Sequence, residues 1–183
     1  MGKRPLVRRR GRGGMQFRAA KTGKIAPAKY PNFDPKESHI VEIVDLVHET
    51  GRDVPLAKIR LDNGSNSFLP AVIGSKVGSK IQFGYESGIV DGNVNSIQNI
   101  PDGTTVCNVE KQVGDGGSFI KSAGTSATIF SHGDDGVTLK LASGKFITLN
   151  KKNRAMIGTL AGGGVTDRPL MRAGVNWRRF RSK

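Results

Sequence analysis

The chain has 183 residues, 36% of them hydrophobic and 25 of them glycine, with a net charge of +14 and a pI near 10.3. This composition favours short strands joined by turns over a large helical core. The single cysteine, Cys107, excludes an intramolecular disulfide and a Cys₄ or Cys₂His₂ zinc site. No run approaches the roughly 18 apolar residues of a membrane helix, and no apolar segment follows the basic N-terminus. We therefore expect a cytoplasmic protein without a membrane partner.

The N-terminal segment, residues 1–36, carries 11 basic side chains and one acid. Residues 8–14 read Arg-Arg-Arg-Gly-Arg-Gly-Gly. Arginine binds phosphate through paired hydrogen bonds and stacks on bases, and glycine lets the backbone follow a groove closely. Phe17, Tyr30 and Phe33 follow among the basic residues, where they could stack on unpaired nucleotides. The glycine and proline content argues against helix in residues 1–35, so we predict an extended RNA-binding arm over 1–36.

Residues 37–86 have the pattern of a small β-barrel. Short apolar or alternating runs end at turn residues, and Asp62-Asn63-Gly64-Ser65 is a strong hairpin signal. Pro70 assigns its strand to a sheet edge. The predicted strands are 39–47, 56–61, 67–71 and 80–83.

Residues 87–161 continue the same pattern. The glycine-rich stretch 84–95 has the weakest strand character and marks our predicted domain boundary. About ten short strands at ten-residue spacing, with little helix, indicate an all-β protein of two small barrels rather than a parallel sheet. The strands predicted here are 96–100, 105–110, 126–130, 137–141, 145–149 and 154–160.

Other possible sites have a weak basis. The Gly114–Gly117 loop lacks the Gly-Lys-Ser/Thr ending of a phosphate-binding loop, so a plain turn is favoured. The three histidines are scattered without the spacing of a metal site, and Cys107 is expected to be a small core residue. Asp134 and Asp135 form a turn with flanking glycines. We therefore expect no catalytic residues, no metal, no cofactor and no small-molecule substrate.

The C-terminal segment is the second concentration of charge. Residues 151–183 carry nine basic side chains and one acid, whereas residues 37–150 have a net charge of −4. A solvated face or a disordered tail could explain one basic run, but two around a near-neutral body favour a polyanionic partner. The glycines 162–164 are either a linker to a basic tail, 162–183, or a point of close approach to RNA. The predicted RNA contacts are Arg8, Arg9, Arg10, Arg12, Arg18, Lys29, Tyr30, Lys151, Lys152, Arg154, Arg172, Trp177, Arg178 and Arg179.

Several motifs together resemble one known family, the L-two ribosomal proteins of the large subunit, and their order and spacing match throughout. The motifs are Gly-Asp-Gly-Gly-Ser at 114–118, Ala-Gly-Thr-Ser-Ala at 123–127, Leu-Ala-Ser-Gly at 141–144, Asn-Arg-Ala-Met-Ile-Gly at 153–158 and the glycines 162–164. The archaeal and eukaryotic branch is matched at 10–14, 17–18, 29–30 and 167–170.

The resemblance implies an OB-fold barrel over 37–86 followed by an SH3-like barrel over 87–161, with extended basic terminal segments on RNA. It also implies large-subunit ribosomal RNA and other ribosomal proteins as partners, a place near the peptidyl transferase region and a role in subunit association. Family members continue through Gly-Val-Ala-Met-Asn and His-Pro-x-Gly-Gly-Gly motifs that residues 1–183 do not contain. Whatever that histidine contributes is not carried over to this sequence.

Two functions from other classes remain open on the sequence. One is a free translation factor or messenger-RNA-binding module built from similar barrels, which would exchange on and off RNA. The other is an enzyme acting on RNA, which would need clustered carboxylates for metal ions or a His/Cys pair. The basic ends are expected to be disordered when free and ordered on RNA, because they cannot bury a core alone.

Overall fold

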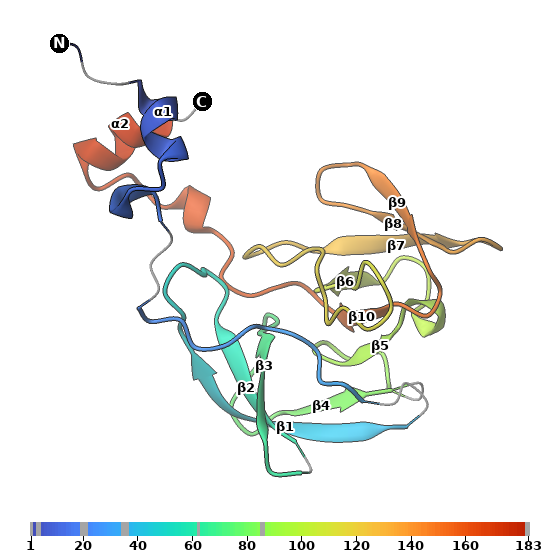
Figure 1. The fold of residues 1–183 in the computed structure, drawn as a ribbon. Coiled ribbons are helices and arrows are strands. Elements are labelled where there is room, and N and C mark those ends of the chain that lie inside the picture. The colour runs from blue at the N-terminus through green and yellow to red at the C-terminus, as the bar shows by residue number, and fades with distance from the viewer. Residues whose placement is uncertain are drawn as a thin grey trace.

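The computed structural model describes residues 2, 5–18, 22–33, 37–61, 63–84 and 87–181, and it confirms the all-β prediction (Figure 1). Ten strands form one continuous sheet in the order β3-β2-β1-β4-β5-β10-β6-β7-β8-β9. The strands are β1 His39–Val47, β2 Leu56–Arg60, β3 Asn66–Pro70, β4 Lys80–Phe83, β5 Val94–Ser96, β6 Thr105–Cys107, β7 Ala127–His132, β8 Val137–Lys140, β9 Phe146–Leu149 and β10 Arg154–Ile157.

Strands β1 to β4 form the first half of the sheet. β1 pairs with β2 and β4, and β2 pairs with β3, all antiparallel. Alternate side chains of β1, such as Val41 and Ile43, are buried, as the period of a strand with one core face requires. Pro70 ends β3, which is an edge strand of the sheet, as predicted.

In the second half, β5 to β10, strands β6 and β10 each end three residues earlier than predicted, and one predicted strand is replaced by another element. The segment 96–100 is not a strand, because β5 ends at Ser96 and a 3-10 turn, η2 (Ile97–Asn99), follows. Ile97 and Ile100 are both fully buried. Side chains three residues apart lie on the same side of a 3-10 helix, so this geometry sends both into one core, whereas a strand would point them to opposite faces.

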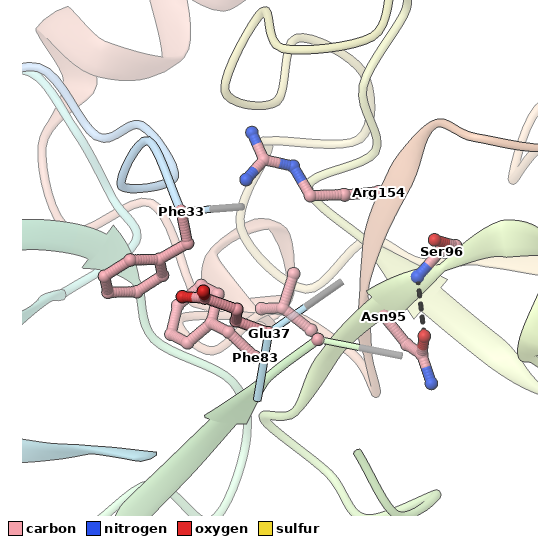
Figure 2. A pocket seen from close by; sticks show the side chains of 8 residues that line it. Phe33, Glu37, Phe83, Asn95, Ser96 and Arg154 are labelled. Atoms are coloured by element: carbon pink, nitrogen blue, oxygen red, sulfur yellow. Dashed lines mark hydrogen bonds between the residues drawn. The ribbon is translucent and has the colours of Figure 1, made fainter. Parts of the chain in front are cut away.

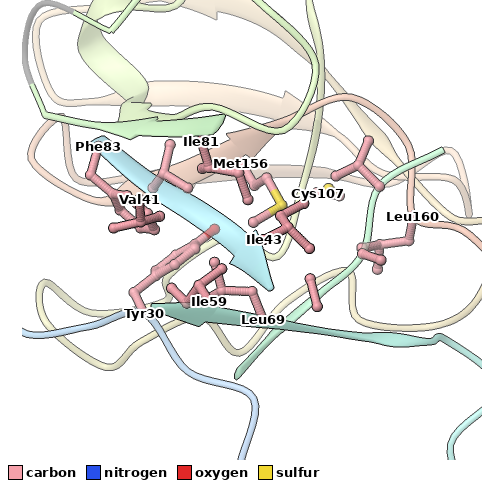
Figure 3. Close-up of a cluster of buried hydrophobic side chains, with 14 of the residues drawn as sticks. Tyr30, Val41, Ile43, Ile59, Leu69, Ile81, Phe83, Cys107, Met156 and Leu160 are labelled. Atoms are coloured by element: carbon pink, nitrogen blue, oxygen red, sulfur yellow. The ribbon is translucent and has the colours of Figure 1, made fainter. Parts of the chain in front are cut away.

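The two halves meet where β4 and β5 pair in parallel through Phe83 and Val94. One hydrophobic cluster lies among β1 to β4, but it also includes Cys107, Met156 and Leu160 of the second half (Figure 3). A separate cluster fills the second half and includes Ile129, Val137 and Leu139. The halves therefore share a packed boundary and are not joined by a bare linker.

Both basic segments contain short helices, so the prediction of no helix in residues 1–35 is wrong. The helices are α1 (Leu6–Gly11), the 3-10 turns η1 (Met15–Phe17) and η3 (Val165–Asp167), and α2 (Ala173–Arg181). Pro5 precedes α1 and Gly11 ends it, so these residues bound the helix instead of interrupting it. Arginine is a good helix former, and the three arginines of the last turn complement the helix dipole. Figure 1 shows α1 and α2 beyond the strands, near the two chain ends.

The glycines after β10 approach the protein's own backbone. A Cβ atom at Gly162 would lie 2.5 Å from the carbonyl oxygen of Asp53, and one at Gly124 would lie 2.6 Å from the Cα atom of Gly163. Gly162 and Gly124 also have positive φ angles of 79° and 67°. The start of the C-terminal segment therefore packs against the loops that contain Asp53 and Gly124. This packing within the protein accounts for the glycines, without a free linker or a contact with RNA.

Candidate nucleic-acid interface

Residues 22–33, which we call the strap, bind both halves of the sheet. The backbone N–H of Lys29 donates to the carbonyl of Phe68 on β3 (3.2 Å), and that of Tyr30 donates to the carbonyl of Gly116 (3.0 Å). In addition, the backbone N–H of Thr50 donates a hydrogen bond to the Gly23 carbonyl of the strap (3.2 Å). This part of the predicted arm is therefore folded against the barrels in the protein alone.

Tyr30 is part of the core, and the prediction that it stacks on RNA is wrong. Its side chain is 6% exposed, its hydroxyl donates to the carbonyl of Asn108, and its ring meets Phe83 edge-on at 6.3 Å. Burial, followed by the nearby Cys107 and Glu110, raises the pKa of the Tyr30 hydroxyl well above its usual value. A ring held in this way cannot turn outward to a base without opening the core.

Phe33, at the end of the strap, also makes contacts inside the protein. Its ring stacks on that of His39 with centroids 4.1 Å apart, and it meets Phe83 at 5.4 Å. Two of the aromatic residues in the basic N-terminal segment, Tyr30 and Phe33, thus pack within the protein and are not free to stack on RNA.

Arg154 forms an internal ion pair, which contradicts its assignment as a phosphate contact. Its Nη2 and Nε atoms donate to Oε1 of the fully buried Glu110 at 2.7 and 3.1 Å, and its Nη1 donates to the carbonyl of Pro31 at 3.1 Å. Its guanidinium also lies 5.4 Å from the centre of the Tyr30 ring. With a side chain only 12% exposed, Arg154 fixes the strap to β10 and presents little of its guanidinium to a phosphate.

A small cavity lies beside this ion pair (Figure 2). Its volume is about 10 Å³, and Phe33, Phe83, Asn95 and Arg154 are among the residues that line it. Such a volume is at the lower limit for one water molecule. The cavity therefore gives no support for a small-molecule substrate.

Most of the other predicted contacts are exposed. Arg8, Arg9, Arg10, Arg12 and Arg18 are exposed in or after α1, and no residue of α1 is buried. In the C-terminal segment Arg172 and Arg178 are exposed, and Trp177 is 59% exposed. Lys29 and Lys152 are also exposed, while Lys151 is half-buried. The side chain of Arg179 lies outside the described residues.

The Gly114–Gly117 loop is a turn around its own carboxylate. Asp115 accepts the backbone N–H groups of Lys111 (2.9 Å) and Gly117 (2.8 Å) and the hydroxyl of Ser118 (2.9 Å). Partial burial raises the pKa of Asp115, but these hydrogen bonds outweigh it and the pKa lies below its usual value. Within the loop, the N–H of Gly117 serves Asp115 and the N–H of Gly116 donates to Glu110 (3.1 Å), so neither is presented to a phosphate.

Lys121 and Glu110 are the polar residues that sequence reasoning missed. The Lys121 ammonium donates to the carbonyls of Ala28 (2.7 Å) and Gly117 (2.9 Å), which joins the strap to the Asp115 turn. Burial, aided by Arg52 and Lys29, lowers the pKa of Lys121. Nothing local in the sequence pairs these residues with partners about 40 to 90 positions away.

The remaining chemistry-bearing residues have structural roles. Cys107 is buried, and burial raises the pKa of its thiol to about 12, so it is an unreactive core residue, as predicted. The Nδ1 atom of His132 lies 2.6 Å from Oδ1 of Asp102. Within the described ranges, no group of three or more His, Cys, Asp or Glu side chains could hold a metal ion. Nor is any helix in those ranges long and apolar enough to cross a membrane.

Comparison with known proteins identifies the family. The model of the C-terminal domain of ribosomal proteins L2 matches residues 90–183. The large ribosomal subunit protein uL2 of Cenarchaeum symbiosum is 69% identical over the whole chain, and that of Nitrosopumilus maritimus is 67% identical, each with 75% of the relative covered. The protein of Sulfurisphaera tokodaii is 42% identical, with 76% covered. The chain belongs to the uL2 family.

Membership in the uL2 family confirms the resemblance found in the sequence, on the archaeal side of the family. It also confirms the predicted fold class, an OB-fold barrel followed by an SH3-like barrel. The family is a structural component and not an enzyme, which agrees with the lack of a catalytic constellation in the sequence.

Proposed function

We propose that this chain is a cytoplasmic structural constituent of the large ribosomal subunit that binds large-subunit ribosomal RNA near the peptidyl transferase region and supports subunit association. Family membership supports the place in the subunit and the partnership with other ribosomal proteins. The single observation that supports RNA binding is the separation of charge. A body of net charge −4 carries exposed arginines in two terminal segments.

In this proposal the two barrels are a rigid anchor, divided at residues 86 and 87, and the terminal segments are the cationic arms. We define the arms as residues 5–18 and 165–181, since residues 22–33, the strap, are hydrogen-bonded to the barrels. Each arginine that neutralises a phosphate releases a condensed cation, so the affinity falls as salt rises. With six to ten such contacts, the affinity would fall roughly 10³- to 10⁵-fold between about 50 and 200 mM salt.

The test is the salt dependence of binding to transcribed large-subunit ribosomal RNA. Deleting residues 1–36 would remove Tyr30 from the core, so the sharper variant changes only exposed side chains. The variant replaces arginine by glutamine at positions 8, 9, 10, 12 and 18. We expect the slope of log affinity against log salt to become shallower by up to about 4.5, since each lost phosphate contact removes roughly 0.7 to 0.9. An unchanged slope would refute the role of this arm.

A matched control for this variant is Arg60→Gln, on an exposed position of the near-neutral body. It removes a charge without touching either arm, and we expect the slope to change by less than the smallest single-contact step of about 0.7. The competing function, a free translation factor, predicts a different behaviour in a sucrose gradient. A ribosomal constituent stays with the large subunit in moderate salt, whereas a factor leaves it.

A further inference from the structure

We propose that the outer face of strands β7, β8 and β9 binds an unpaired RNA base on the rings of Phe130 and Phe146. This contact would be additional to the terminal arms. It rests on the proposed function and adds a named site to it. Figure 1 draws these three strands at the upper right and the terminal helices at the upper left.

The two rings meet on a surface that nothing else in the described chain covers. Phe130 on β7 is 58% exposed and Phe146 on β9 is 54% exposed. Their ring centroids are 5.0 Å apart with an interplanar angle of 70°. Since β8 lies between β7 and β9, the strands that carry them are about 10 Å apart, and the rings must lean toward each other across β8.

The core does not need these rings. In β7, Ala127 and Ile129 are buried, and in β8, Val137 and Leu139 are buried. Phe130 and Phe146 occupy the opposite face, where a strand with one solvated side ordinarily has polar residues. Exposed apolar side chains are common singly, but an aromatic pair more than half exposed is a feature of binding surfaces.

The backbone at Phe130 is irregular. The register between β7 and β8 shifts between Ile129 and Ser131, so Phe130 has no direct partner in the ladder. A bulge of this kind increases the local twist and redirects side chains, and it occurs often beside functional sites. The position of the Phe130 ring is thus set by a local feature of the strand and not by cross-strand pairing alone.

The charge beside the rings is positive. Lys140 on β8 lies directly opposite Phe146, and Lys145 immediately precedes Phe146. Both lysines are exposed. The acids of this hairpin, Asp134 and Asp135, lie in the turn between β7 and β8, at the other end of β8 from Lys140. A local excess of lysine stands out in a body whose net charge is −4.

This combination favours RNA over a protein partner. Lysine is depleted in the centre of protein interfaces, whereas aromatic rings beside basic residues recur where proteins bind unpaired nucleotides. A base stacked on Phe146 would place its flanking phosphates within the reach of long lysine side chains. Every base has a flat face, so such a platform accepts many sequences.

The experiment measures binding of the full chain to transcribed large-subunit ribosomal RNA, with no other protein present. Replacing both phenylalanines by alanine should weaken binding about 5- to 150-fold for each stacked base. The salt slope should stay the same, because stacking releases no counterions. Lys140→Gln should instead make the slope shallower by about 0.7, as for one phosphate of a single strand.

Two variants separate stacking from loss of apolar surface or of fold. Phe146→Leu keeps an apolar side chain without an aromatic face, and we expect it to weaken binding almost as much as Phe146→Ala. Ile40→Ala is a matched control, because Ile40 is 54% exposed on a strand of the other half, and it should bind as the wild type does.

A fluorescence measurement makes the test independent of small changes in stability. Trp177 is the only tryptophan, so Phe146→Trp in a Trp177→Phe chain carries a single reporter on the proposed platform. Ribosomal RNA should quench its emission. If wild-type chain binds the RNA while the phenylalanine variants bind equally well and the reporter is unchanged, the platform is refuted and the proposed function stands. If wild-type chain fails to bind at low salt, the proposed function itself fails.

Discussion

The strap and the arms carry net charge of the same sign but have opposite environments. Residues 22–33 include Lys24 and Lys29 and belong to the same basic segment as Arg8–Arg12, yet Ala28, Tyr30 and Pro31 are buried between the barrels. The helix α1 has no buried residue at all. Positive charge alone therefore does not identify the part of a ribosomal protein that is free to bind RNA. The strap differs from the arms because a few small or aromatic residues lie among its basic residues and are buried.

The largest effect should come from removing the buried ring of the strap. Tyr30→Ala leaves a cavity among Phe83, Cys107 and Arg154 and removes the bond to Asn108, so we expect a loss of about 3–5 kcal/mol in the free energy of unfolding. Arg10→Ala, in the same basic segment but exposed, should change it by less than about 0.5 kcal/mol. Urea denaturation checks both, and equal effects would break the distinction between strap and arm.

The ion pair that holds the strap should come next. Glu110→Ala leaves the guanidinium of Arg154 with less than its full set of partners in a buried site, and we expect a loss of about 3–5 kcal/mol. Replacing both residues, Glu110→Gln with Arg154→Met, should cost less than Glu110→Ala, because no buried charge is left unpaired. A double-mutant cycle built from Glu110→Gln, Arg154→Met and their combination would show, if it gave simple additivity, that the two side chains do not interact.

The base of the C-terminal arm offers a parallel test. Gly124→Ala should destabilise the fold by about 2–4 kcal/mol, since the new Cβ would meet the Gly163 backbone at 2.6 Å in addition to the strain of a positive φ angle. Gly144 also has a positive φ, 82°, but open space around it, so Gly144→Ala should cost only about 1–2 kcal/mol. Thermal unfolding compares the two, and an equal shift in Tm would mean that Gly163 is not held there.

A last effect, absent near neutral pH, should be a loss of stability in alkali. Burial raises the pKa of Cys107 from 9.0 to about 12 and raises that of Tyr30, so both stay protonated in the folded chain while they ionise in the unfolded one. The unfolded state then binds fewer protons, and stability falls as pH rises from about 9 toward 12, by up to about 1.4 kcal/mol per pH unit for each group.

Cys107→Ala should lower stability at neutral pH but flatten this decline, because the alanine has no proton to lose. Urea denaturation at pH 7 and at several values between 9 and 12 separates the two effects. An identical pH dependence in wild type and variant would contradict the raised pKa of the thiol.

The strands and hairpins were predictable from sequence because their signals are local. The alternation in 56–60 and the turn at 62–65 are complete within a few residues, and β2 and β3 pair as expected. The segment 96–100 was misassigned because Ile97 and Ile100 read equally well as strand or as 3-10 turn. The helices α1 and α2 were not predicted because they are short. Their arginines were interpreted as RNA-binding residues and not as helix formers.

The site was only partly predictable, for a different physical reason. The exposed arginines follow from composition, but the burial of Tyr30 and Arg154 depends on partners distant in sequence, Asn108 and Glu110. Phe130 had a usable signal, an aromatic residue out of phase with the buried Ala127 and Ile129. Its contact with Phe146 needs the order of β7, β8 and β9.

Amide hydrogen exchange on the full chain, free and bound to ribosomal RNA, tests the central claim most directly. The strap amides of Lys29 and Tyr30 are hydrogen-bonded within the protein, and we expect them to exchange slowly in both states. The arms, residues 5–18 and 165–181, contain helices too short to be stable alone and should be protected only on RNA. Rapid exchange of the strap in the free chain, or arms already protected without RNA, would contradict the account.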